Sequence, residues 1–246
     1  MSLLPINAFK LAGYNWKKYL TAFIALTMLL ILYFNIDNIK FLKTIVLVLM
    51  IAILWFTFSS FISFYWLFDI SKFSKWDWVT TLIEYSPKTC LLLSTGLKEN
   101  AVNINKLFPK SNNITHDIYN KNIMPESALN LARKKINSAS TNSTHLLPIE
   151  NSWAELTIVS LSVHEIRNQK ARTEFFHELR RITKKKHTII LIEHIRNFLS
   201  FLTLGPSAYH YYPHKEWIRL AKASNFKIVN MQNITPFVRV FTLSKS

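Results

Sequence analysis

The sequence predicts an α/β protein: a doubly wound, mainly parallel sheet that ends in an antiparallel hairpin and is preceded by a helical hairpin that spans a membrane. Leu156–Leu161 and Thr188–Ile192 are short apolar runs separated by a charged segment with helical spacing. That pattern indicates two parallel strands joined by a helix, because strands buried on both faces do not alternate polar and apolar residues. Further short apolar runs and amphipathic segments follow each other along residues 76–246, and two long uncharged stretches precede them.

The two uncharged stretches are long enough to cross a membrane. Neither Tyr19–Ile36 nor Thr44–Phe68 contains a charged residue, and about 20 apolar residues cross a hydrocarbon core of about 30 Å. We therefore expect an N-terminal segment with two transmembrane helices in residues 1–68, at about 19–36 and 44–68, and an α/β domain in residues 69–246. Two buried core helices are the alternative, but the length of the second stretch argues against a soluble core.

Basic residues near the spans predict the orientation of the hairpin. The start of the chain and the region after the second span carry lysines, and the connecting loop carries Lys40 and Lys43 beside Asp37. This small bias, with an even number of spans, places the α/β domain on the side of the chain's start. We expect a two-pass protein of the cytoplasmic (inner) membrane with its α/β domain in the cytoplasm.

Composition limits the classes of partner and site. The 30 basic and 14 acidic residues give a net charge of +16, which suggests an anionic partner such as the surface of a lipid bilayer; a solvated lysine-rich surface is the alternative. We expect no nucleic-acid partner, because the basic residues are scattered and form no recognised motif. The single cysteine, Cys90, excludes an internal disulfide and is expected in the core. Three glycines cannot build a GxGxxG or Walker loop anywhere in the chain.

Elements expected in the α/β domain follow from apolar spacing and from prolines that end helices. The strands are Thr89–Ser94, Asn113–Asp117, a weak third strand within Asn137–Thr144, the two strands named above, and a closing hairpin of Phe226–Ile234 and Val238–Leu243. The helices are Trp76–Tyr85, Lys98–Phe108, Glu126–Ile136, Gln169–Lys186, with a buried stripe of Phe175, Phe176, Leu179 and Ile182, and His214–Ser224.

Three stretches carry a family resemblance: LPIENSWAELTIVSLSVHEI, FFHELRRITKKKHTIILIEH and EWIRLAKASNFKIV. In this order, over about residues 76–246, they resemble the class I S-adenosylmethionine-dependent methyltransferases, in particular the ubiquinone and menaquinone biosynthesis (type 11-like) branch. Behind a membrane hairpin, the combination HEIR, FFHELRR, EHIRNF and TPF also resembles a bacterial group of membrane-anchored methyltransferase-like proteins. The resemblance implies a Rossmann-like sheet and S-adenosylmethionine as cofactor.

The cofactor loop departs from the family pattern. The family has Asp-x-Gly-x-Gly-x-Gly after the first strand, whereas this chain has LLLSTGLKENA, in which only Gly96 matches. Glu99 could supply the missing carboxylate from a helix start, or it could be an ordinary acid of a first helical turn. The departure leaves open whether the cofactor still binds.

Other residues correspond to the family's cofactor contacts. The resemblance implies that Asp117 binds the ribose hydroxyls and that Tyr119 lies on the adenine, although Asp117 could instead cap a turn. Asn142 or Ser143 would replace the usual acid that contacts the adenine amino group. Ser162, after the fourth strand, completes the expected cofactor-binding set.

Polar side chains follow the fourth and fifth strands, where ligands of open α/β sheets bind. His164 and Glu165 end one strand, and Glu193 and His194 end the next. If the acceptor must lose a proton, His164, Glu165 and His194 are the candidate catalytic residues. The alternative is structural, with a loop-ordering histidine and two ion pairs, Glu165–Arg167 and Glu193–Arg196. A metal site from His164, Glu193 and His194 lacks diagnostic spacing, so we assign no metal ligand.

The segment Asn197–Pro213 is apolar and aromatic. In this fold it would cover the cleft where acceptors enter, which favours an apolar, small-molecule or lipid-soluble acceptor; simple packing, or a surface that lies on the bilayer, are the alternatives. The sequence thus predicts a membrane-anchored S-adenosylmethionine-dependent methyltransferase. The alternative is a catalytically inactive methyltransferase-like binding or scaffold protein at the membrane that has lost its cofactor.

Overall fold

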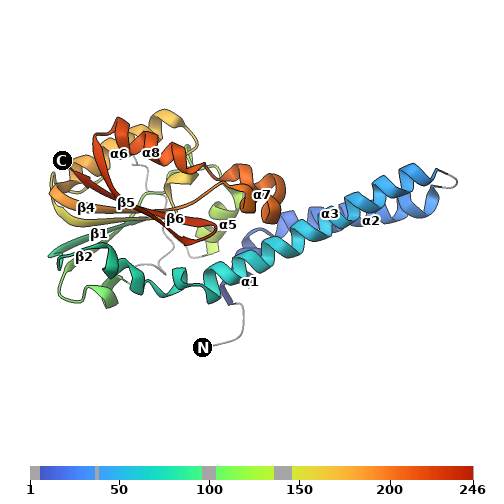
Figure 1. The fold of residues 1–246 in the computed structure, drawn as a ribbon, viewed down its shortest axis with the longest axis horizontal. Helices are drawn as coiled ribbons and strands as arrows, with labels where there is room; N and C mark the ends of the chain where they lie inside the picture. The colour runs from blue at the N-terminus through green and yellow to red at the C-terminus, as the bar shows by residue number, and fades with distance from the viewer. Residues whose placement is uncertain (1–5, 37–38, 96–103, 136–145, 246) are drawn as a thin grey trace. The chain divides into compact units, whose positions relative to one another are not determined.

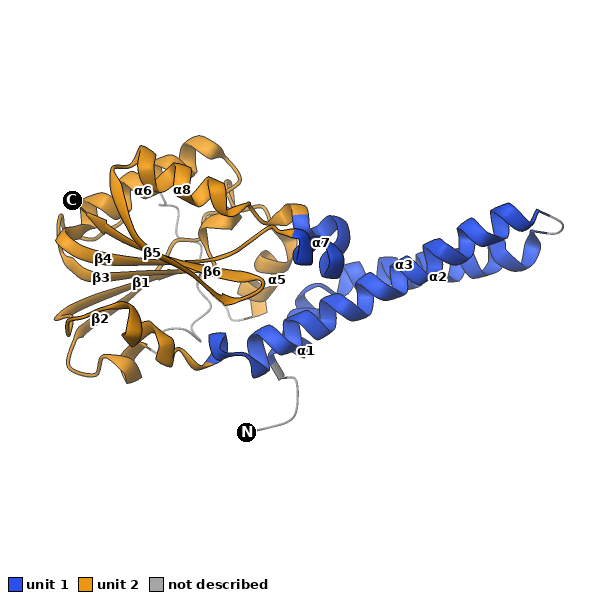
Figure 2. Cartoon of the chain, viewed as in Figure 1, with its two compact units in different colours: residues 1–74, 198–208 blue, residues 75–197, 209–246 orange. Residues whose placement is uncertain are grey.

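The computed structural model describes residues 6–36, 39–95, 104–135 and 146–245. They form two compact units (Figure 2). The helical unit spans residues 1–74 together with 198–208, and the α/β unit spans residues 75–197 together with 209–246. Each unit has its own packing and is described separately below.

A single mixed sheet forms the centre of the α/β unit (Figure 1). Among the described residues its strand order is β2-β1-β3-β4-β6-β5, in which β1 to β4 run parallel and β6 is antiparallel to both of its neighbours. This arrangement confirms the predicted α/β sheet with its closing antiparallel hairpin. The weak third strand expected within Asn137–Thr144 lies outside the described residues. The strands are β1 (Thr89–Ser94), β2 (Asn112–Asp117), β3 (Ala154–Ser160), β4 (Thr183–His194), β5 (Phe226–Thr235) and β6 (Val238–Lys245).

Strands β1, β3 and the second half of β4 are buried on both faces, which explains why these apolar runs do not alternate. Helices α6 (Gln169–Ile182) and α8 (His214–Ala223) lie side by side against the sheet (Figure 1). The predicted stripe of α6 is fully buried in the core, and so is Trp217 of α8. Cys90 is buried in β1, and burial raises the pKa of its thiol to about 11, as expected for a core residue.

The boundary between α6 and β4 differs from the prediction. The helix was expected to continue to Lys186, but it ends at Ile182, and Lys184–Lys186 belong to β4. Pairing across the sheet explains the difference, because the Thr183 hydroxyl lies 3.0 Å from that of Thr157. The short helix expected at Trp76–Tyr85 is a 3₁₀ turn at Asp77–Leu82, and α5 (Ser127–Lys135) forms as expected.

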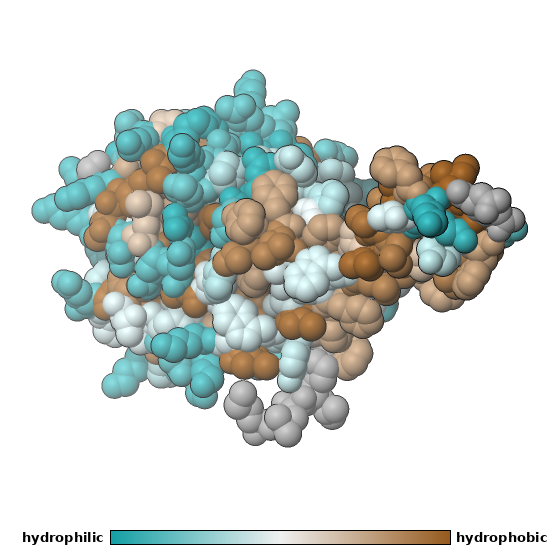
Figure 3. Space-filling view, turned by 45° about the vertical axis from the view of Figure 1, so that its right-hand side comes forward, coloured by the Kyte–Doolittle hydropathy of each residue, from teal (hydrophilic) through white to brown (hydrophobic). Residues whose placement is uncertain are grey.

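The helical unit contains two long apolar helices, α2 (Trp16–Asn35) and α3 (Lys40–Tyr65), after a short α1 (Ile6–Tyr14). Both are long and apolar enough to cross a membrane. None of the described residues of α2 is buried, and in α3 only Val46 is. Brown, apolar surface predominates over this unit in Figure 3, whereas teal surface predominates over the α/β unit.

The segment after β4 returns to the helical unit. Helix α7 (Phe198–Leu204) packs against α3, where the Trp55 indole N–H donates to the Leu202 carbonyl at 2.8 Å and the Ser59 hydroxyl donates to the Thr203 carbonyl at 2.6 Å. Gly205 follows with a φ of +55°, and a β-carbon there would lie 3.1 Å from the Phe56 ring. The positive φ and the close approach of the Phe56 ring both favour glycine at this turn.

Candidate functional site at the strand ends

The strand order reverses direction beside β1, which pairs with β2 on one side and with β3 on the other. In open α/β sheets, ligands bind outside the carboxyl ends of the strands at such a switch point. Ser94, Asp117 and Ser160 end the three strands there. Four of the predicted cofactor-binding residues, Gly96, Glu99, Asn142 and Ser143, lie outside the described residues.

Asp117 stands at the end of β2, as the ribose-binding prediction requires, but its carboxylate has partners in the chain. Oδ2 lies 2.6 Å from the Arg133 guanidinium, and Oδ1 accepts from the Tyr119 backbone N–H at 2.9 Å. The same guanidinium lies 4.1 Å from the centre of the Tyr119 ring and donates to the Thr95 carbonyl at 2.5 Å. Arg133 thus already contacts the Asp117 carboxylate and the face of the Tyr119 ring, which are the two groups that a bound nucleoside would contact.

Glu193 organises the loop that follows β3. Its fully buried carboxylate accepts from the backbone N–H of Ser162 at 3.2 Å and of Val163 at 2.7 Å, and its other oxygen lies 2.6 Å from Nδ1 of His164. The Ser162 hydroxyl donates to the Ser160 carbonyl. Ser162 therefore shapes the loop through both its backbone and its side chain.

The ion pair with Glu193 determines the protonation of His164. Burial by itself would lower the pKa of His164, but the charges and hydrogen bonds of Glu193 and Glu165 outweigh burial and raise it to about 10. At Glu165, burial by itself would raise the pKa of the carboxyl. The hydrogen bonds and charges of His164 and His210 outweigh burial and hold that pKa well below its usual range. At neutral pH His164 is consequently a cation held between two carboxylates.

The structure corrects the two ion pairs expected from the sequence. Glu165 pairs with His164 and His210 instead of Arg167, and Glu193 pairs with His164 instead of Arg196. Arg167 donates to the His210 carbonyl at 2.7 Å and contacts its ring. His164 lies beside Glu165 in the loop after β3, and His210 reaches the same carboxylate from the end of the 3₁₀ segment Gly205–His210.

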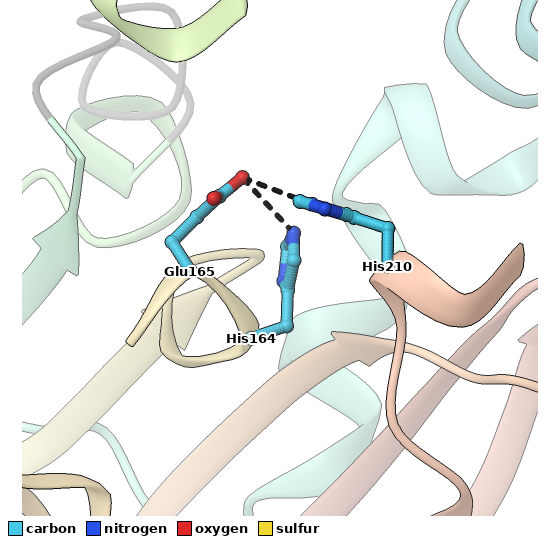
Figure 4. A group of neighbouring side chains, drawn as sticks. All are labelled: His164, Glu165 and His210. Carbon is cyan, nitrogen blue, oxygen red and sulfur yellow. Dashed lines mark ion pairs between the residues drawn. The ribbon is translucent and has the colours of Figure 1, made fainter. Parts of the chain in front are cut away.

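His210 is the member of the cluster that sequence reasoning missed. It ends the 3₁₀ segment Gly205–His210, and its Nε2 lies 3.4 Å from Oε1 of Glu165, the same distance as Nε2 of His164 (Figure 4). Figure 4 shows the three side chains pointing toward one another from two segments of the chain. The run Tyr209–Pro213, a histidine among aromatic residues after a strand that ends in Glu-His, was the available signal.

His194 and Tyr211 line the same cluster. Their ring centres are 4.5 Å apart, and the His194 ring centre is 5.5 Å from that of His164. Burial, followed by the charges of His164 and His210, lowers the pKa of His194 well below its usual value. Burial also raises the pKa of the Tyr211 hydroxyl. His194 is therefore the neutral imidazole of the group.

Arg172 of α6 ties the two segments of the cluster together. Its buried guanidinium donates to the carbonyls of Ile166 at 2.7 Å and Arg167 at 2.9 Å, and to the Tyr212 hydroxyl at 2.8 Å. It also forms an ion pair with Glu216 of α8 at 3.0 Å. One side chain thereby positions the His164–Glu165 loop against the segment that carries His210.

No family model matches the chain, and no curated protein sequence matches it. Solved structures resemble its fold. A SAM-dependent methyltransferase from Aquifex aeolicus is 14% identical with a TM-score of 0.55, covering 74% of this chain and 93% of its own. One from Methanosarcina mazei is 14% identical with a TM-score of 0.51, covering 69% of this chain and 97% of its own.

Human N-acetylserotonin methyltransferase, solved in complex with SAM, is 12% identical with a TM-score of 0.59 and covers 100% of this chain and 72% of its own. Identities this low show a shared fold. With the strand order β2-β1-β3-β4-β6-β5, the chain has the Rossmann-like fold of the class I SAM-dependent methyltransferases.

Proposed function

We propose that the chain is a membrane-anchored, S-adenosylmethionine-dependent methyltransferase that acts on a small, lipid-soluble acceptor. One observation carries the proposal: the methyltransferase strand order with an acid, Asp117, at the carboxyl end of the strand beside the switch point. The neighbours of the same fold include a structure with SAM bound. The fold and this acid together favour that cofactor over other ligands of α/β sheets.

The residues around the switch point suit a nucleoside. The side chain of Asp117 is 20% exposed, so a ribose diol can reach its carboxylate if the Arg133 guanidinium releases Oδ2. Tyr119 offers the adenine an aromatic surface. Gly96, Glu99, Asn142, Ser143 and Ser162 remain the further proposed contacts. S-adenosylmethionine would supply the reactive methyl group, and the protein positions the acceptor in line with it.

The strand-end cluster would handle the acceptor's proton. Neutral His194 can take a proton, whereas His164 is already protonated, so we propose His194 as the base. Glu165 and His164 would hold the acceptor and stabilise the charge that develops on it. Glu193 fixes His164 by the hydrogen bond to Nδ1. Tyr211 packs on His194, with ring centres 4.5 Å apart, and covers this side of the imidazole.

The helical unit supports a membrane location. A helix that is apolar on all sides is buried in a core or in a bilayer, and apart from Val46 no described side chain of α2 or α3 is buried within the chain. Helix α7 adds Phe198, 77% exposed, to the apolar surface of the same unit. We propose that α2 and α3 span the inner membrane and that the α/β unit is cytoplasmic, where an acceptor can arrive from the bilayer.

The second candidate function is a catalytically inactive scaffold. The Asp117–Arg133 ion pair favours it, because this pair satisfies the acid without any ligand. The replacement of the family's loop glycines around Gly96 favours it as well. Both observations concern the cofactor, so a cofactor-binding measurement separates the two functions.

Calorimetric titration of the detergent-solubilised full-length protein with S-adenosylhomocysteine, the demethylated cofactor, tests the proposal. We expect saturable binding of one equivalent. Asp117→Asn should weaken it at least about 10-fold, since a charged hydrogen bond contributes about 1.5–3 kcal/mol. The matched control Asp77→Asn changes an exposed acid elsewhere in the same unit and should leave the affinity unchanged. Absence of binding at millimolar ligand would support the scaffold.

A further inference from the structure

We propose that His164, Glu165 and His210 form a binding site for one divalent transition-metal ion, with zinc as the preferred ion. Nε2 of each histidine and one carboxylate oxygen of Glu165 would be the ligands. The methyltransferase fold does not require this site, and metal binding can be measured independently of cofactor binding.

The positions of the three donor atoms fit an ion. Oε1 of Glu165 lies 3.4 Å from Nε2 of His164 and 3.4 Å from Nε2 of His210. Donor atoms at zinc bond lengths of about 2.0–2.1 Å lie about 3.4 Å apart at the corners of a tetrahedron. All three donors lie within 4.8 Å of one another, so one ion can reach them with small side-chain movements (Figure 4).

The types of donor favour zinc over magnesium or calcium. Two imidazoles with one carboxylate are a common catalytic zinc set, and hard ions prefer oxygen ligands alone. The set leaves a fourth position open, unlike structural sites that fill all four. Adjacent His164 and Glu165 come from the loop after β3, whereas His210 comes from a segment that is distant in sequence.

Glu193 provides the partner that metal-bound histidines usually have. Nδ1 of His164 lies 2.6 Å from its carboxylate, which directs Nε2 toward Glu165. A carboxylate in this position fixes the tautomer and raises the basicity of the ligating nitrogen. Glu126 stands in the corresponding place behind His210, 3.5 Å from Nδ1. His164 is therefore backed by a carboxylate, whereas the Arg167 guanidinium contacts Nδ1 of His210 more closely than Glu126 does.

Unbalanced charge provides an independent argument. Glu126, Glu165 and Glu193 surround the cluster, and Arg167, which contacts the His210 ring, is the basic side chain that faces them among the described residues. Three carboxylates against Arg167 and the protonated His164 leave the group with a net charge of −1, which favours a bound cation. In addition, Oε2 of Glu165 is buried and has no hydrogen-bond partner among the described residues. Such an orphaned carboxylate oxygen is costly unless a cation binds it.

The open coordination position would face the acceptor, a point that rests on the proposed function. A hydroxyl or thiol bound there would lose its proton more readily, since zinc lowers the pKa of a bound water to about 7. His194 and Tyr211, which pack against His164, border this position. The metal site and the proposed base would then act on the same acceptor atom.

Zinc chloride titrated calorimetrically into the chelator-treated full-length protein in detergent tests the site. We expect one equivalent to bind with micromolar or tighter affinity. His210→Ala and Glu165→Gln should each weaken binding at least about 100-fold, because even outer partners of metal ligands contribute about 10–100-fold. The control His177→Ala removes an exposed histidine of α6 and should not change the affinity.

X-ray absorption at the zinc edge of the loaded wild-type protein provides a readout that does not depend on the variants folding. Two imidazoles at about 2.0–2.1 Å support the site. Failure of zinc to bind, a sulfur ligand from Cys90, or wild-type affinity in either His210→Ala or Glu165→Gln overturns it. Zinc binding without S-adenosylhomocysteine binding would refute the proposed function and leave the metal site intact.

Discussion

Single buried side chains set the geometry of the strand ends, and Arg172 with Glu216 offers a direct test. Hydrogen bonds to Arg219 first, and to Arg172, outweigh burial and lower the pKa of the Glu216 carboxyl. A folded-state pKa below the unfolded value of about 4.3 means that the carboxylate stabilises the fold above that pH and loses its contribution as the pH falls through the folded pKa.

We expect Glu216→Gln to destabilise the protein by about 1 kcal/mol at pH 7, which corresponds to a melting temperature about 2–4 °C lower. Thermal melts followed by circular dichroism at pH 7 and at pH 3.5 measure the effect. The difference between wild type and variant should shrink at the lower pH. An equal difference at both pH values would contradict the role assigned to this ion pair.

The positions of some candidate site residues were predictable from a simple rule, whereas their roles stay proposals. His164, Glu165 and His194 follow directly after apolar runs, so the rule that parallel strands end at one edge was sufficient to bring them together. His210 was missed because its place depends on the path of a distant segment. The partners of Glu165 and Glu193 were wrong for the same reason: sequence proximity favoured the arginines, and tertiary placement favoured the histidines.

Among the elements, α7 depends on one glycine. Gly205 has a φ of +55°, and an added β-carbon would meet the Phe56 ring at 3.1 Å. Gly205→Ala should therefore loosen α7 from α3 and cost at least about 1 kcal/mol. Limited proteolysis within residues 198–208 should become faster. Gly13→Ala is the control, because an added β-carbon at this position in α1 would have no atom within 4 Å and alanine favours a helix. Equal proteolysis rates in both variants would contradict the role of Gly205.

Elements with strong apolar runs were predictable, and boundaries decided by tertiary contacts were not. Strands β1, β2, β5 and β6 begin and end within a few residues of their predicted bounds. The lysines at 184–186 suit the end of a helix on local grounds. Strand pairing overrode that preference, and the ammonium of Lys184 lies 2.9 Å from the carboxylate of Glu155 on β3. No local signal reports such a pairing.

For the whole molecule, the proposed membrane anchor predicts that the protein resists extraction from membranes by alkaline carbonate. Leu49→Arg in the middle of α3 should release it, because arginine at the centre of a span costs about 2.5–3.5 kcal/mol in insertion. The control Val229→Arg makes the same kind of change at an exposed apolar residue of β5 in the α/β unit. The protein that carries it should stay in the membrane fraction. Extraction of the wild type by carbonate would contradict the proposed spans.

Methyl transfer by the membrane-bound protein tests the central claim most directly. Membranes that contain the protein are incubated with S-adenosylmethionine labelled on its methyl group, and the label in the organic-extractable fraction is measured. We predict incorporation that exceeds membranes without the protein and falls at least about 10-fold with Asp117→Asn, but not with Asp77→Asn. Incorporation equal to that of membranes without the protein would contradict the methyltransferase and favour the scaffold.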